Sequence, residues 1–288
     1  MTVLGIGLWL ALAAAPPPTV SPGIQVSISG LEPRQGEILE LVIIDDRVTR
    51  VSGAKGEKNF FFFPAPERKG EWVALVPFDL GDAPGDYPLR LDIWTSAGQE
   101  ERKEIMVTLA PGQFGRRELW LPRGQVIPPE ELRARIAAER ALLDEVLGRV
   151  SAGIQITGRF LLPFPGFLGE GFGEERILNG VKRSPHGGVD CGAREGTSVS
   201  ASNSGTVVLV RSLYYEGNTV IIDHGLGIFT FYLHLKAVAV AEGRKVERGE
   251  VIGWVGHSGR GTGPHLHFGV KILGERVDPN QLWNFSFD

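Results

Sequence analysis

Short apolar runs alternate with turn signals over about residues 20–110. Turn clusters such as Leu80-Gly81-Asp82-Ala83-Pro84-Gly85-Asp86 separate runs that have the length of strands. This spacing predicts a small β-sandwich of the immunoglobulin-like (Ig-like) kind. The aromatic run Phe60 to Phe63, which ends at Pro64, is better explained as a core strand than as a ligand patch. The other predicted strands are Ile24 to Ser29, Ile38 to Ile44, Glu71 to Val76, Tyr87 to Trp94 and Glu104 to Leu109.

A helical pattern follows between Pro128-Pro129 and Gly153, where apolar side chains recur at helical spacing among charged ones. Proline at the start and glycine past the end are ordinary helix boundaries. The pattern predicts a linker helix over Glu130 to Val150 that packs on one of the domains through a single apolar stripe. The stripe comprises Leu132, Ile136, Leu143, Val146 or Leu147, and Val150.

Strand-like runs return in the C-terminal part of the chain and predict a twisted antiparallel sheet with long loops. These runs are Thr206 to Val210, Thr219 to Ile222, Ile228 to Leu233 and Val251 to Val255. The predicted fold class is therefore mainly β. The predicted divisions are a signal peptide at 1–15, the β-sandwich at 16–122, the linker helix at 123–153 and a C-terminal domain at 154–288.

Composition supports two domains with cores of their own. The chain has 288 residues, of which 42% are hydrophobic, with 39 glycines and 19 prolines, as in turn-rich β structure rather than disorder. Its 30 Lys and Arg and 34 Asp and Glu give a net charge of -4 without a basic run, so nucleic acid is not an expected partner. One cysteine allows no internal disulfide and leaves the compartment open.

The N-terminal run Val3 to Ala15 is apolar, too short for a spanning helix, and ends in small residues. This pattern is typical of a secretory signal, so we expect an exported protein in the periplasm, the cell envelope or the extracellular space. Cleavage after Ala13, unlike cleavage after Ala15, keeps Pro16 from the first mature position. Retention of the run as an anchor is the alternative. We expect no integral membrane span in the mature form.

Candidate chemistry is concentrated in two segments, His186-Gly187-Gly188-Val189-Asp190 and His265-Leu266-His267. Side chains alternate along a strand, so His265 and His267 share a face, and the even spacing of His186 and Asp190 lets them do the same. Two imidazoles and a carboxylate, with a fourth position open for water, suit a catalytic zinc, which lowers the pKa of its water to roughly 7. The pattern predicts a zinc hydrolase. No His-Glu-x-x-His occurs, which excludes the helix-borne zincin arrangement.

These segments belong to a longer series of motifs over about residues 157–283. The series is Phe172-Gly173, Asn179-Gly180, His186-Gly187-Gly188-Val189-Asp190, Tyr232-Leu233-His234-Leu235, Gly256-His257-Ser258-Gly259 and Gly263-Pro264-His265-Leu266-His267-Phe268. It resembles the LytM/lysostaphin-type zinc metallopeptidases of family M23. The resemblance implies a LytM-type antiparallel β-sheet peptidase domain, one Zn²⁺ per chain bound by His186, Asp190 and His267, and a catalytic pair, His234 and His265.

The resemblance also implies an activity, hydrolysis of peptide cross-links in bacterial peptidoglycan, with the peptide stems as the partner. The bond cut, a D,D cross-bridge or a glycine-rich one, and the division of roles between His234 and His265 stay open. The alternative is a catalytically idle wall-binding activator of another hydrolase, since some family members serve in that way. A further alternative is that the N-terminal domain contacts the catalytic groove and inhibits it.

Other residues near these motifs have simpler expectations. We expect His224 to be a turn histidine and Cys191 a small buried hydrophobe that points away from the metal. His257, in a glycine-rich turn, is a candidate for substrate contact. Gly269 stands where the family often has Glu, so a hydrogen-bond partner for the histidines must come from elsewhere. Asn179 could block the zinc, as an asparagine does in some latent relatives, but a plain turn residue is favoured.

Overall fold

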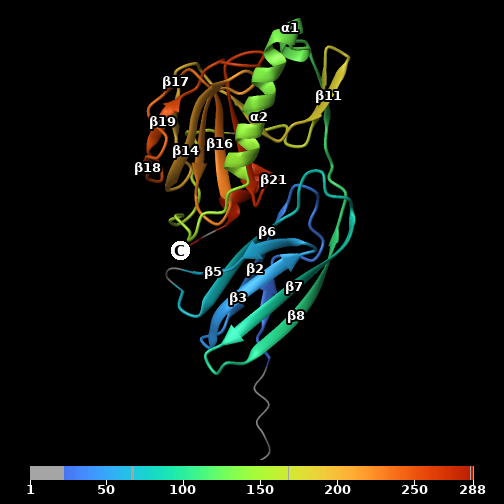
Figure 1. Cartoon of the computed structure of the whole chain (residues 1–288), viewed down its shortest axis with the longest axis vertical. Helices are drawn as coiled ribbons and strands as arrows, with labels where there is room; N and C mark the ends of the chain where they lie inside the picture. Colours follow the sequence, from blue (N-terminus) through green and yellow to red (C-terminus); the bar gives the residue numbers. More distant parts are fainter. Residues whose placement is uncertain (1–22, 66–67, 168, 286, 288) are drawn as a thin grey trace, which may run out of the picture.

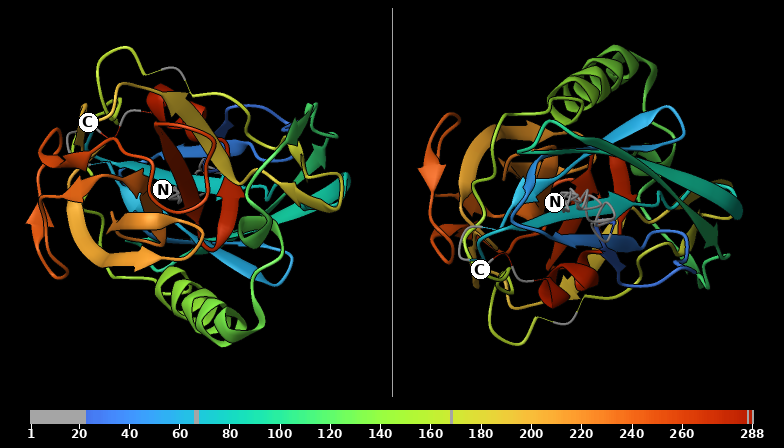
Figure 2. Two further views of the ribbon diagram at one scale, coloured as in Figure 1. Left: turned by 90° about the horizontal axis from the view of Figure 1, so that it is seen from above. Right: turned by 90° about the horizontal axis from the view of Figure 1, so that it is seen from below.

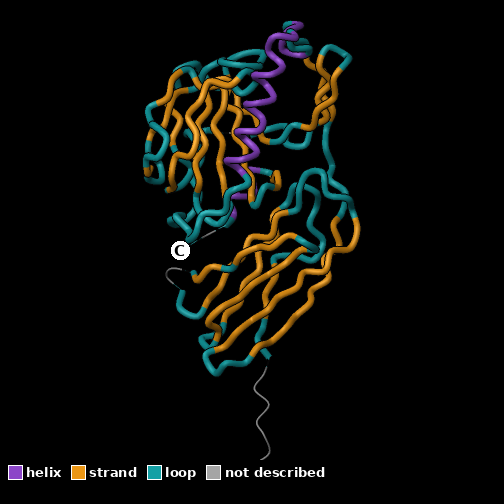
Figure 3. Tube along the Cα trace, in the orientation of Figure 1, coloured by secondary structure: helices purple, strands orange, loops and turns teal. Residues whose placement is uncertain are grey.

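Two β-rich parts make up the molecule, a computed structural model that describes residues 23–65, 68–167, 169–285 and 287 (Figure 1). Strands dominate both parts, and one long helix lies along the C-terminal part (Figure 3). The predicted fold class, mainly β with antiparallel sheets, is confirmed. The predicted signal peptide at 1–15 lies outside the described residues. Within them, no helix is long and apolar enough to span a membrane.

The N-terminal part is a sandwich of two four-stranded sheets, with the orders β1-β2-β6-β5 and β4-β3-β7-β8. The strands are β1 Val26–Ile28, β2 Ile38–Ile44, β3 Val48–Lys55, β4 Lys58–Phe61, β5 Phe63–Pro64, β6 Glu71–Pro77, β7 Gly85–Thr95 and β8 Glu100–Leu109. Alternation along β2 sends Leu39, Leu41 and Ile43 into the core between the sheets. The sequence did not predict β3. The aromatic run divides between β4 and β5, and Phe61 is 40% exposed.

The segment between the two parts holds short helices and the main helix. These elements are β9 Arg116–Leu119, α1 Arg123–Val126, the 3₁₀ turn η1 Glu130–Leu132 and α2 Arg133–Leu147. The helix is shorter than predicted, and Val150, placed on its apolar stripe from the sequence, is 49% exposed. Val146 and Leu147 are buried, and they pack on the C-terminal sheet against Leu209 and Phe229. Figure 2 shows α2 on the outer flank of the molecule.

The C-terminal part is built on a seven-stranded sheet of order β12-β20-β16-β15-β14-β18, with β21 beside β20. Its strands are β12 Gly188–Gly192, β14 Gly205–Leu213, β15 Gly217–Asp223, β16 Ile228–Leu235, β18 Lys245–Val246, β20 His265–Ile272 and β21 Glu275–Val277. Two three-stranded sheets, β13-β19-β17 and β11-β10-β9, complete it, together with the 3₁₀ helix η2. Their elements are β10 Glu175–Leu178, β11 Lys182–Pro185, β13 Ser198–Ser200, β17 Ala237–Val238, β19 Val251–Trp254 and η2 Pro279–Asn284.

Strand β9 joins the C-terminal part, although it lies before residue 122, where the sequence placed the end of the sandwich. It pairs in parallel with β10, so that Leu119 lies opposite Leu178. The strand is therefore an edge of the wall beside the predicted site rather than a member of the sandwich.

The two parts share one apolar core. The outer face of the sandwich, through Val73 and Leu75 of β6, joins the same cluster as Phe160 and Phe287. The ring of Phe63 stacks on that of Phe287, with 5.7 Å between centroids. One sheet of the sandwich is thus covered on both faces, which fixes the two parts against each other.

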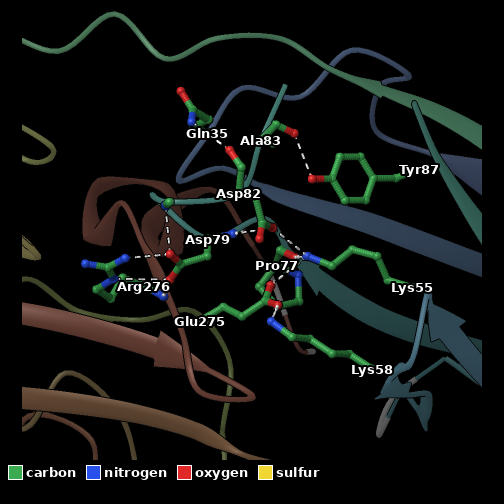
Figure 4. Close-up of polar contacts among 11 residues, drawn as sticks. Gln35, Lys55, Lys58, Pro77, Asp79, Asp82, Ala83, Tyr87, Glu275 and Arg276 are labelled. Carbon is green, nitrogen blue, oxygen red and sulfur yellow. Dashed lines mark hydrogen bonds and ion pairs between the residues drawn. The ribbon is translucent and has the colours of Figure 1, made fainter. Parts of the chain in front are cut away.

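Ion pairs reinforce this contact on β21 (Figure 4). The buried Lys55 ammonium lies 2.7 Å from the carboxylate of Glu275 and 3.0 Å from that of Asp82. Next to it, the guanidinium of Arg276 lies 2.6 Å from the Asp79 carboxylate. Lys55, Asp79 and Asp82 come from the sandwich, so the pairs with Glu275 and Arg276 cross between the two parts, whereas Asp82 holds Lys55 from within the sandwich.

Candidate metal centre

The candidate metal centre is built on the pairing of β12 with β20. The strands are antiparallel, and Asp190 lies directly opposite His267. Leu266 and Cys191 point into the core, as alternation requires, and Cys191 is buried there as expected. His265, His267 and Asp190 are left on the other face. The strand register alone therefore brings a carboxylate and two imidazoles to one surface.

His186 reaches this surface from the residues that precede β12. Its Nδ1 lies 2.8 Å from the carbonyl oxygen of Gly171, which can only accept a hydrogen bond, and 3.0 Å from Nη2 of Arg176, which can only donate. We assign the proton to Nδ1 on the shorter contact, because the Arg176 group also donates to Asp190. The ring therefore presents the lone pair of Nε2 to the site. Nε2 lies 2.9 Å from Nδ1 of His267 and 3.2 Å from Oδ1 of Asp190. Nδ1 of His267 and Oδ1 of Asp190 are themselves 2.8 Å apart.

These three atoms suit a bound metal ion. Ligand atoms around a tetrahedral ion with bonds of ~2.0 Å lie roughly 3.3 Å apart, so small outward shifts would accommodate an ion. Among the described residues, one group of side chains has a geometry that could hold a metal ion. It consists of the three predicted ligands, His186, Asp190 and His267. The two sequence motifs thus meet in space, although His186 lies before β12 and not on the strand that its even spacing from Asp190 predicted.

Arg176, on β10, holds the outer oxygen of the Asp190 carboxylate. Its Nη2 donates to Oδ2 at 2.7 Å, which leaves Oδ1 for the site. Burial raises the pKa of Asp190, but hydrogen bonds and charges from His186 and His267 outweigh burial and hold the pKa well below its ordinary value. Burial also disfavours the charged form of His267, and in a histidine this lowers the pKa. No sequence pattern marked Arg176, because its contact with Asp190 depends on the packing of β10 near β12.

His234 enters the site through an irregularity in β16. Simple alternation would send it into the core with Tyr232, but its φ is +63° and the register with β15 shifts between Asn218 and Val220. Such a bulge re-aims a side chain. The His234 ring then lies 4.7 Å, centroid to centroid, from that of His265. Only the family resemblance, and not periodicity, placed His234 in the site.

Carbonyl contacts orient both rings of this pair in the same way. Nδ1 of His234 lies 2.8 Å from the carbonyl oxygen of Ser258, and Nδ1 of His265 lies 2.8 Å from that of Gly263. Nδ1 therefore carries the proton in each, and Nε2 keeps a lone pair. Nε2 of His265 lies 3.8 Å from Oδ1 of Asp190. Burial, and then the neighbouring His267 and His265, lower the pKa of His234 to about 3.

These side chains line an open pocket of about 240 Å³. One wall comes from β9 and from the glycine-rich segment at 166–185, with Leu119 and Arg176 among its residues. The opposite wall holds Glu216 and Arg260, which the sequence did not mark. The Arg260 guanidinium lies over the ring of Tyr215, 4.5 Å from its centroid. Together the walls form a groove (the metal-side groove) that ends at the three candidate ligands.

Asn179 does not reach the candidate metal centre. It has a φ of +50°, and its amide both donates to and accepts from the backbone of Leu121 at 2.8 Å. It is the turn residue that the sequence favoured, and its contacts tie β10 to the segment after β9. His257 is exposed at the rim, with Nε2 3.3 Å from the carbonyl oxygen of Gly261.

His224 lies just past the end of β15 and is fully buried, which the expectation of a turn residue did not foresee. Its Nδ1 lies 2.7 Å from the carbonyl oxygen of Ser204, and its Nε2 lies 2.8 Å from the Thr230 hydroxyl. Both ring nitrogens thus have protein partners. His224 is a structural histidine, and burial lowers its pKa to about 4.

Comparison with known proteins places this site in a family. Residues 184–279 match the model of Peptidase family M23. Peptidoglycan DD-endopeptidase ShyA of Vibrio cholerae serotype O1 is 42% identical over 112 residues, which are 38% of this chain and 26% of that protein. DD-carboxypeptidase/endopeptidase Mpg of Neisseria meningitidis serogroup B is 47% identical over 94 residues, 33% of this chain and 22% of that protein. The chain thus matches about a quarter of the length of these relatives.

A solved structure extends the similarity to the sandwich. A provisionally assigned M23 peptidase from Pseudomonas aeruginosa has a TM-score of 0.61 at 25% sequence identity, over 88% of this chain and 96% of that chain. Neither part of the present molecule alone accounts for that coverage, so the two-part architecture is shared. The motifs, the strand register and these comparisons agree that the chain carries a peptidase family M23 domain.

Proposed function

We propose that the protein is a zinc-dependent endopeptidase that hydrolyses peptide cross-links of bacterial peptidoglycan. The observation that carries this proposal is the convergence of donor atoms from His186, Asp190 and His267 at the end of the metal-side groove, beside His234 and His265. The relatives ShyA and Mpg, described as DD-endopeptidases, support peptidoglycan peptide stems as the substrate.

The donor set favours zinc, one ion per chain. Two imidazole nitrogens and one carboxylate oxygen with an open fourth position are typical of catalytic zinc sites. When bound, the ion would polarise the scissile carbonyl and make its water acidic enough to attack near neutral pH. Arg176 would hold the Asp190 carboxylate so that a single oxygen faces the ion, as an outer-shell partner does.

His234 and His265 would supply the proton transfers. Their Nδ1 protons are held by carbonyl oxygens, so each ring presents Nε2 as an acceptor for a proton from the attacking water. A ring that has taken this proton becomes a donor at Nε2 and can stabilise the developing oxyanion. Because both rings have the same tautomer, the geometry leaves both roles open to each.

Digestion of purified peptidoglycan, followed by mass spectrometry of the released fragments, tests activity and bond choice together. We expect separated peptide stems from the native protein and none from the Asp190→Ala variant. The masses identify the bond as a D,D cross-bridge or a glycine-rich one. A zinc-loaded protein that releases no fragments but stimulates another wall hydrolase would support the activator function instead. A metal-free protein with full activity would contradict the zinc mechanism.

Export follows from the same proposal, since peptidoglycan lies outside the cytoplasmic membrane. The apolar run Val3 to Ala15 supports it, and the mature protein should then begin near Ala14. Intact mass of the protein recovered from its native envelope is the test. Retention of Met1 would favour an anchor or a cytoplasmic protein.

A further inference from the structure

Lys271 lies on the same face of β20 as the candidate ligands, four positions beyond His267. In the sheet it lies directly opposite a second cation, Arg276 of β21. Like charges in that position repel unless one of them is neutralised. The sandwich provides the neutralising charge, because Asp79 binds the Arg276 guanidinium at 2.6 Å and Figure 4 shows it drawn toward Asp79. Lys271 itself forms no ion pair within the described part of the chain.

The surface between His267 and Lys271 carries no side chain. Gly269 lies between them on β20 and pairs with Gly188 of β12, which follows Gly187. We call these three residues the glycine lane. A Cβ on Gly188 would lie 2.5 Å from the Phe268 carbonyl oxygen, so glycine is required there. A Cβ on Gly269 would meet nothing nearer than 3.5 Å, so this position has room for a side chain and leaves the space open.

The open space is a depression of about 230 Å³ that continues the metal-side groove. Gly187, Gly269 and Lys271 line it, with Phe231 and Leu233 as apolar neighbours. Gly187, Glu216, Leu233 and His267 line both hollows, so the two are joined at the candidate ligands. Two carboxylates lie at its edge. Asp144 attracts the Lys271 ammonium without forming an ion pair and lies 3.9 Å from Arg140, and Glu216 is attracted by Arg260.

We propose that Lys271 and the glycine lane form a subsite for a free carboxylate of the peptide substrate. Lys271 is a cation with no ion pair among the described residues, and it lies at one end of a glycine surface beside apolar side chains. Such a surface fits an extended backbone that ends in, or carries, an anionic group. An extended peptide advances about 3.4 Å per residue, as β20 does, so four positions along β20 put the carboxylate about four residues from the bond at the candidate ligands. This subsite rests on the proposed endopeptidase function.

The test uses two synthetic stem peptides that differ only in this group, a carboxylate in one and a carboxamide in the other. We expect the zinc-loaded native protein to cleave the carboxylate peptide with a kcat/KM about tenfold higher, as a charge-assisted hydrogen bond at a partly exposed site provides. The preference should vanish in Lys271→Met and survive in Lys271→Arg, with zinc content unchanged. Lys236→Met is the matched control, because Lys236 pairs with Glu195 elsewhere on the surface.

A second pair of variants tests the glycine lane. Gly269→Glu places a carboxylate beside Lys271 and should abolish the preference, because the new side chain takes the place of the substrate anion. Gly269→Gln has the same size without the charge, so it should lower both rates and keep a preference for the carboxylate peptide. Equal preferences in the two variants would overturn the pairing with Lys271.

The subsite and the proposed function fail in different ways. If native protein cleaves both peptides equally well, the endopeptidase proposal stands and the subsite is wrong. If it cleaves neither peptide nor peptidoglycan, the endopeptidase proposal is wrong, and calorimetric binding of the two uncleaved peptides decides the subsite. Tighter binding of the carboxylate peptide that is lost in Lys271→Met supports it, and equal binding overturns it.

Discussion

One backbone angle at His234 decides whether the chain presents a fourth imidazole to the groove. A strand that continued in regular alternation would bury this ring beside Tyr232 in the apolar core. The positive φ and the bulge turn it outward, where the Ser258 carbonyl holds its Nδ1. A non-glycine residue in this conformation costs of order 1–3 kcal/mol and persists only where the surrounding structure enforces it.

The five candidate site residues should separate into ligands and catalysts. Replacing His186, Asp190 or His267 by Ala removes a metal bond, so zinc content and hydrolysis should fall together. Replacing His234 or His265 should keep the zinc and lower the rate by on the order of 10² to 10⁴, the usual size of a proton-transfer or oxyanion contribution. Elemental analysis beside turnover measures both. Zinc loss in His265→Ala with zinc retention in His267→Ala would reverse the roles along β20.

His224 should make the fold sensitive to acid. Its pKa is about 4 in the folded protein and about 6.5 when unfolded, so folding favours the neutral ring. That stabilisation is complete above pH ~6.5 and is lost as the pH falls toward 4, a change of about 3 kcal/mol. The free energy of unfolding should therefore decline more steeply over this interval in the native protein than in His224→Gln. Parallel declines in the two proteins would contradict this assignment.

At the scale of elements, the segment between the two parts packs as part of the C-terminal domain. Strand β9 extends the wall of the metal-side groove through β10, and α2 covers the outer face of β14, β15 and β16. Both elements precede the region in which the sequence motifs begin. A fragment that starts at residue 157 would lose both elements, so it would not represent the intact C-terminal domain.

The contact of α2 can be tested with a matched pair of truncations. Leu147 is 6% exposed and packs in the cluster with Phe229, so Leu147→Ala should lower the free energy of unfolding by about 2–4 kcal/mol. Val150, three residues further along the chain, is 49% exposed. Val150→Ala should therefore change the free energy of unfolding by less than about 0.5 kcal/mol. Chemical denaturation gives both values. Similar losses in the two variants would mean that the helix packs through a different stripe.

At the scale of the whole molecule, the sandwich packs directly against the C-terminal part. Its sheet faces the C-terminal core through Val73 and Leu75, and buried ion pairs close the contact on β21. All residues that line the metal-side groove come from residue 117 onward, so no described residue of the sandwich lines that groove. By holding Arg276, it shapes the groove surface near Lys271.

Breaking the buried pair at this contact should loosen the docking. Glu275→Gln leaves the Lys55 ammonium buried with Asp82 as its remaining counterion, which should cost about 3 kcal/mol. Lys58→Met removes a 63% exposed partner of the same carboxylate and should cost less than about 1 kcal/mol. We expect Glu275→Gln to unfold in two steps and to be cut between the parts by limited proteolysis. A single transition at the native midpoint would show that the apolar contact suffices.

The sequence by itself determined the features that depend on local periodicity. Alternation put His265 and His267 on one face, and the apolar runs marked most strands, including β2 over Ile38–Ile44. The continuous apolar run in β6 is explained by burial on both faces, although only the structure shows that the second face meets the C-terminal core. The predicted family and fold class are confirmed, while the roles of the site residues stay predictions.

The tertiary structure decided what depends on pairing between segments distant in the chain. No periodicity marks Arg176 as the partner of Asp190, because that contact exists only once β10 lies beside β12. Nor does it mark the edge strand β9, which is short and polar and gains its hydrogen bonds from β10 alone. The bulge at His234 and the space over Gly269 likewise arise from register and packing. Local sequence fixes which face a side chain prefers, but the long-range register fixes which side chains meet.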